Sequence, residues 1–165
     1  MSASQGLTHG QDQPPTGQRF ERILLASEGR TISRATVNRV IELARRSDAS
    51  VRVLSIARVY GVAFGLPNPG LLPTKREWDE QSEMVGKVVR QLERKGIEAD
   101  GHVVGTRNAT KKILEEAELA GCDAIVMAAD RDRSRILGDF SWSQEPQRVR
   151  RRAKIPVFLI SEEAE

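Results

Sequence analysis

Two short polar stretches contain the side chains best suited to bind a ligand. Ser27-Glu28-Gly29-Arg30 follows the aliphatic run 23–26, and a longer charged stretch, 130–142, follows the apolar run 123–129. Continuous apolar runs of this length are typical of strands buried on both faces of a parallel sheet. In such sheets ligands bind beyond the carboxyl ends of strands, where the strand order reverses. We therefore expect the two stretches to line one pocket.

Residues for covalent or metal chemistry are scarce. Cys122 is the single cysteine, which excludes an intrachain disulfide and a cysteine-built metal site, and we interpret it as a small core residue. The histidines, His9 and His102, have no nucleophile near them in the sequence pattern. The P-loop and the Gly-x-Gly-x-x-Gly pattern are both absent. We therefore expect neither catalysis nor a metal.

The elements that would position the two stretches alternate along the chain. Apolar runs predict strands at 23–26, 51–57, 97–104, 123–129 and 155–160. Helical spacing predicts helices at 33–46, from the Thr74/Glu77 capping box to Gly96, from Asn108 to Gly121, and from a Ser143 cap with Pro146 in its first turn. Residues 58–73 carry too many Gly and Pro for regular structure.

This alternation predicts an α/β fold, an open five-stranded parallel sheet with helices on both faces. The strand at 97–104 is the least apolar and suits a sheet edge, whereas the strand at 123–129 suits the interior.

Length and composition fit one water-soluble domain. The chain has 165 residues, 39% of them hydrophobic, and a net charge of +3, too small an excess to indicate nucleic acid. Residues 1–19 have almost nothing apolar to bury, so we expect a disordered tail followed by one domain at 20–165. With no long apolar segment and no secretion signal, we expect a cytoplasmic protein without a membrane anchor.

Four segments together resemble the universal stress protein family over Phe20 to Ser161. They are ILLASEG, Gly105 followed by the helix Ile113-Leu114-Glu115-Glu116-Ala117, the strand CDAIVMA, and the closing RVRRRAKIPVFLI. Each segment is weak alone, but their order and spacing are specific. The resemblance implies a Rossmann-like sheet with the strand order 3-2-1-4-5 and a homodimer, often formed by pairing of the last strands.

The resemblance also indicates which residues ATP binding would require. Family members that bind ATP carry Gly-x2-Gly-x9-Gly-Ser/Thr after the fourth strand, where glycines let backbone N–H groups approach phosphate. Here Ala128 and Arg131 stand at the first two glycines, Ser143-Gln144 stand at the closing pair, and two residues are inserted between. Glu28 replaces the family's Asp after the first strand. The candidate pocket is therefore Ser27, Glu28, Gly29, Ala128, Arg131, Ser143 and Gln144, and ordinary ATP binding is not expected.

Two features of the region 131–154 keep alternatives open. Its eight cations against three acids fit either a solvated helix face or a site for phosphate or a polyanion, and we favour the first. Phe140 and Trp142 would either close the pocket or stack on a nucleobase or partner. Without a nucleic-acid motif, nucleic acid is an unlikely partner.

Together these observations predict a non-enzymatic stress-response domain that dimerises and binds a partner protein. The expected dimer edge is Val157, Phe158, Leu159 and Ile160, whose backbone and apolar side chains suit a symmetric copy. The alternative is an ATP- or AMP-binding sensor or slow ATP hydrolase. In it, Arg131 and the helix start at Ser143 would replace the glycines, and Glu28 would help to hold a cation.

Overall fold

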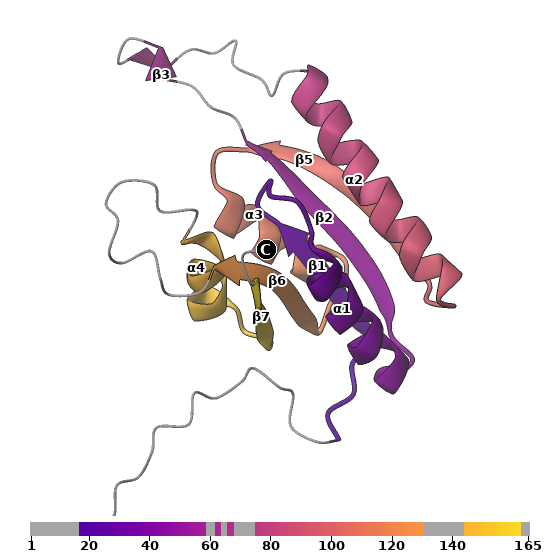
Figure 1. The fold of residues 1–165 in the computed structure, drawn as a ribbon. Coiled ribbons are helices and arrows are strands. Elements are labelled where there is room, and N and C mark those ends of the chain that lie inside the picture. The colour runs from indigo at the N-terminus through magenta and orange to yellow at the C-terminus, as the bar shows by residue number, and fades with distance from the viewer. Residues whose placement is uncertain (1–16, 59–61, 64–65, 68–74, 131–143, 163–165) are drawn as a thin grey trace, which may run out of the picture.

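Five parallel strands form the predicted sheet in a computed structural model that describes residues 17–58, 62–63, 66–67, 75–130 and 144–162. The strands are β1 (Arg22–Ser27), β2 (Ser50–Arg58), β5 (Ala99–Thr106), β6 (Ala124–Asp130) and β7 (Val157–Glu162), in the order β5-β2-β1-β6-β7 (Figure 1). Counted along the chain this order is 3-2-1-4-5, which confirms the prediction. β1 is central, so its carboxyl end faces the point where the order reverses.

Two helices cover each face of the sheet. α1 (Arg34–Ser47) and α2 (Lys75–Arg94) pack on the face that carries Ile23 and Leu25 of β1, while α3 (Ala109–Leu119) and α4 (Glu145–Arg152) pack on the face that carries Leu24 and Ala26. All four β1 side chains are at most 2% exposed. A strand covered on both faces needs a continuous apolar run, which is why the sequence of β1 does not alternate.

The helix ends follow from their sequence signals. The Ser33 hydroxyl accepts a hydrogen bond from the Thr36 amide at 3.1 Å, and the Asn108 side chain accepts one from the Lys111 amide at 3.0 Å. Gly96 and Gly121, just after α2 and α3, have φ of 77° and 66°, a left-handed conformation that other residues disfavour.

The structure differs from the predictions in three places. A small antiparallel pair, β3 (Val62–Ala63) and β4 (Leu66–Pro67), lies in the segment predicted to be irregular. β5 and β7 each begin two residues later than predicted, because the Ile97 amide donates to the Leu92 carbonyl of the preceding helix and Pro156 has no amide to donate. The N-cap of α4 is Gln144, without a side-chain cap, rather than Ser143.

Some predictions fall outside the described residues. These are the cap proposed at Thr74, the pocket residues Arg131 and Ser143, the aromatics Phe140 and Trp142, and most of the proposed tail. Each helix of the described ranges is too short or too polar to cross a membrane.

Candidate functional site

An ion pair between Glu28 and Arg30 lies just after the carboxyl end of β1. Ser27 and Glu28 are each 2% exposed. The guanidinium of Arg30, whose side chain is 13% exposed, lies with its Nε 2.8 Å from Oε1 of Glu28. Removing one partner of such a pair leaves the other charge uncompensated away from water, which is strongly destabilising. Glu28 thus points into the protein and is paired with its own loop.

Hydrogen bonds between the Ser27 side chain and the backbone close the same loop. The Ser27 hydroxyl donates to the Arg30 carbonyl at 2.5 Å and lies 3.3 Å from the Gly29 amide, which donates to it. Gly29 has φ of 103°, a backbone conformation that side chains strongly disfavour, so the sharp turn needs glycine here. The turn directs Arg30 back toward Glu28.

Two residues that sequence reasoning missed tie this loop to α2. The Gln81 amide donates to the Gly29 carbonyl at 3.0 Å, and its oxygen accepts from the Ser55 hydroxyl at 2.5 Å. Ser55 is fully buried in β2. A serine between Leu54 and Ile56 of β2 was the available signal, because a buried hydroxyl needs a partner.

Ala128 of β6 lies close to the ion pair. Ala128, Glu28 and Arg30 line one small cavity together with Ser27, Ile32 and Thr36, among others. The cavity has no room for the centre of a water molecule. The structure therefore brings Ser27, Glu28 and Ala128 together as predicted, whereas Gln144 is exposed at the start of α4 and does not line this cavity.

A second charged cluster, also missed, lies near the amino ends of the strands. Arg52 of β2 contacts Glu116 of α3 at 2.8 Å and Asp100 of β5 at 2.6 Å, and Arg22 contacts Asp100 at 3.2 Å. His102 lies between Arg52 (Nδ1 to Nη2, 3.2 Å) and Glu116 (Nε2 to Oε1, 3.5 Å). The cluster fixes α3 against the edge of the sheet.

The electrostatics of Arg52 support this structural role. Burial lowers the pKa of Arg52, but the hydrogen bond and charge of Glu116, together with those of Asp100, outweigh burial and raise it. Arg52 is therefore a permanent cation held between two carboxylates, which suits packing rather than proton transfer.

Covalent and metal chemistry find little support in the described ranges. Cys122 is 8% exposed, and burial raises its pKa to about 11, so it is a thiol rather than a reactive thiolate at neutral pH. Between residues 17 and 162, the described parts contain no group of three or more His, Cys, Asp or Glu side chains placed to hold a metal ion.

The predicted dimer edge is partly used within the monomer. Val157, Phe158 and Leu159 are 7%, 6% and 8% exposed, and Phe158 packs edge-on against Phe20 with ring centroids 5.8 Å apart. Ile160 is half-buried. β7 pairs with β6 along one side only among the described strands. A symmetric partner would therefore meet mainly the free backbone of β7.

The basic helix α4 exposes its charges. Pro146 and Val149 are buried, whereas Arg148, Arg150, Arg151 and Arg152 are exposed. Arg148 lies 3.2 Å from Glu145, which also accepts a hydrogen bond from Thr110 of α3. A solvated helix face and a site for phosphate or a polyanion both require exposed arginines, so both interpretations stay open.

The family model of the universal stress protein family matches residues 19–161. A universal stress protein family structure from Burkholderia pseudomallei is 19% identical, with a TM-score of 0.63, and the match covers 85% of this chain and 95% of that one. The universal stress protein of Archaeoglobus fulgidus in complex with dAMP is 18% identical, with a TM-score of 0.62 over 87% and 99% of the two chains.

A family protein from Arabidopsis thaliana with AMP bound is 15% identical, with a TM-score of 0.55 over 87% and 93% of the two chains. No curated protein matches the sequence significantly. At these identities the structures establish the fold, while the family model spans nearly the whole sheet and its helices. The chain belongs to the universal stress protein family.

Proposed function

We propose that the chain is a cytoplasmic, non-enzymatic stress-response domain that dimerises and binds a partner protein, without ordinary ATP binding. The expectation that ATP does not bind in the ordinary way rests on the buried Glu28–Arg30 pair. Its charged atoms lie 2.8 Å apart at the crevice where ligands of this fold class bind. The crevice contains protein side chains where a ligand would need space.

Electrostatics argue in the same direction. A nucleotide entering beside Ala128 would have to displace Arg30, which would leave the Glu28 carboxylate buried without that partner. Breaking a buried pair in this way costs on the order of 3–5 kcal/mol. A triphosphate would also bring negative charge toward a carboxylate.

The proposal is tested by thermal unfolding with and without ATP or AMP, alongside mass spectrometry of the purified protein for retained nucleotide. A ligand present at 100 times its dissociation constant stabilises a protein by about 2.7 kcal/mol. We expect no such stabilisation and no copurified nucleotide. A clear shift with ATP would refute this part of the proposal.

Nucleotide binding remains the second candidate, because the related structures from Archaeoglobus fulgidus and Arabidopsis thaliana hold dAMP and AMP, and a further universal stress protein holds cAMP. In this alternative Arg131 would bind phosphate in place of the missing glycines, with the helix start near Ser143, and Glu28 would exchange Arg30 for a cation. It predicts an ATP-induced rise in melting temperature that Arg131→Ala abolishes.

The free backbone edge of β7 supports the dimer proposal, because an unpaired edge strand readily pairs with another strand. We expect light scattering to give twice the chain mass. Amides of successive strand residues point in opposite directions, so either Ile160→Pro or Ser161→Pro should remove an outward amide. One of the two variants should be a folded monomer; dimers in both would contradict this edge.

A further inference from the structure

A groove lies between α2 and β5, away from the crevice at β1. Its volume is about 460 Å³. α2 contributes Trp78, Ser82, Val85, Gly86, Val89 and Arg90, and β5 contributes Gly101, His102 and Val103. Unlike the cavity beside Glu28, this groove is open to solvent and large enough for side chains of a ligand.

Two glycines shape the groove. A Cβ atom at Gly101 would lie 2.7 Å from both the Val53 carbonyl oxygen and Cγ1 of Val85, so glycine lets α2 pack close to the sheet. At Gly86 the three atoms nearest to a Cβ would all belong to the guanidinium of Arg90, the closest at 3.2 Å. The missing side chain of Gly86 thus lets the Arg90 guanidinium lie close to the helix backbone.

The edge of β5 beside the groove offers backbone hydrogen bonds. Among the described strands β5 pairs only with β2, so its other side presents unpaired N–H and C=O groups. Its eight residues are all exposed or half-buried. An exposed edge of this length can accept an extended peptide as an additional strand.

Side chains around the groove specify the chemistry of such a peptide. Trp78 is 40% exposed, a large apolar surface to leave in water, and Val89, about three turns further along α2, is half-buried. Arg90 is exposed and forms no salt bridge with a described residue; the carboxylate that feels its charge, Glu83, is paired with Lys87. The charged or titratable lining residues are Arg90 and His102, and none of the lining residues is acidic.

A second copy of this chain that added its own β5 to the groove would fit less well than a foreign peptide. The β5 strand of a second copy carries one carboxylate, Asp100, which is already bound to Arg22 and Arg52. It would therefore bring the groove no unpaired negative charge for Arg90.

We propose that this groove binds an extended segment of a partner protein that adds to β5, places an acidic side chain against Arg90 and rests apolar side chains on Val89 and, further along the segment, on Trp78. The inference rests on the proposed function in that a protein partner exists, and it names the class of that partner. It does not depend on whether the crevice at β1 binds nucleotide.

The test is selection of eight-residue peptides, matched to the length of β5, from a random display library against the full chain. Enriched peptides should carry Asp or Glu and an aliphatic or aromatic residue. Their affinity, measured by fluorescence anisotropy, should fall about tenfold or more in Trp78→Ala and in Arg90→Glu, as expected for central anchor residues.

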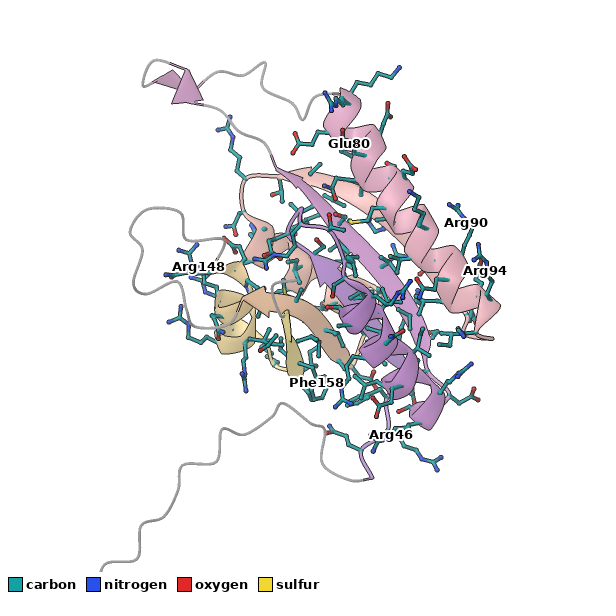
Figure 2. The ribbon with its side chains drawn as sticks, in the orientation of Figure 1. Arg46, Glu80, Arg90, Arg94, Arg148 and Phe158 are labelled. Atoms are coloured by element: carbon teal, nitrogen blue, oxygen red, sulfur yellow. The ribbon has the colours of Figure 1, made fainter. Side chains whose placement is uncertain are left out.

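Arg94→Glu is the matched control. Arg94 carries the same charge on the same helix, one turn further on, and does not line the groove. Figure 2 shows Arg90 and Arg94 along the last turns of α2. Arg94→Glu should leave the affinity within about twofold. Hydrogen exchange of the β5 amides should slow when peptide binds.

Three results would overturn the inference. They are failure to enrich any peptide, equal binding to wild type and Arg90→Glu, and a loss in Arg94→Glu as large as in Arg90→Glu. Dimerisation that Trp78→Ala abolishes would instead assign the groove to a second copy, also against the inference. Nucleotide binding alone would contradict only the proposed function, so the two failures are distinguishable.

Discussion

The crevice at the end of β1 and the groove beside β5 differ in how their charges are used. In the crevice, Glu28 and Arg30 neutralise each other out of water. In the groove, Arg90 is exposed and forms no salt bridge with a described residue, and Trp78, about three turns earlier on α2, is 40% exposed. Among the described residues, the end of β1 therefore carries charges that already have partners, whereas an edge of the sheet remains unpaired. The location of a pocket in a fold class does not by itself identify the surface that binds.

The largest effect should come from breaking the ion pair in the crevice. Arg30→Ala leaves the Glu28 charge buried, and we expect the free energy of unfolding to fall by about 3–5 kcal/mol, measured by urea denaturation. The double variant Glu28→Met/Arg30→Met replaces both charges by apolar groups and should recover most of this loss. A cost below about 1 kcal/mol for Arg30→Ala would mean that the crevice is open to water in solution.

The next effect concerns the glycines of the groove. Gly101→Val forces side-chain atoms against the Val53 backbone and Val85, and should destabilise the protein by about 2–3 kcal/mol. Gly86→Ala is the matched comparison, because its Cβ meets only the flexible end of Arg90 and alanine favours helices by about 1 kcal/mol. Equal destabilisation by both changes would show that α2 does not pack on β5 as described.

Sequence patterns predicted the sheet, its order through the family resemblance, and the helix start at Asn108. These features depend on local patterns: continuous apolar runs, capping residues and terminal glycines. The residues Ser27, Glu28 and Ala128 were also correctly placed together, since parallel strands end at one side of the sheet. The direction of the Glu28 side chain was not predictable, because it depends on the contact with Arg30.

Long-range polar contacts were missed for the same reason. The Arg52 cluster joins residues 64 and 48 positions apart, and the Ser55–Gln81 bond joins residues 26 apart. No local pattern pairs such residues; only the assembled sheet does. The buried side chains of β7 are a related case, since an apolar edge strand could serve a dimer or its own core, and here three of the four predicted residues serve the core.

A smaller effect should follow from loosening the crevice loop. Gln81→Ala removes the partner of the buried Ser55 hydroxyl and of the Gly29 carbonyl, and should cost about 1–2 kcal/mol. Ser82→Ala, the exposed neighbour on α2, should change stability by less than about 0.5 kcal/mol. Hydrogen exchange around Gly29 should rise in Gln81→Ala alone. If it does not, the loop is held without α2.

The smallest effect extends the comparison to the opposite end of the sheet, where Cys122 precedes β6. Burial raises its pKa from 9.0 to about 11, so between these values the unfolded chain loses a proton that the folded chain keeps. Stability should therefore fall as pH rises through this window, by up to about 1.4 kcal/mol per pH unit from this group, and below pH 9 the group should contribute no pH dependence. Comparison with Cys122→Ala removes the contribution of other groups: the stability difference between the two proteins should be constant below pH 9 and shift against wild type at pH 10. A difference that stays constant up to pH 11 would mean that water reaches this end of β6, leaving the Glu28–Arg30 crevice as the more tightly sealed end of the sheet.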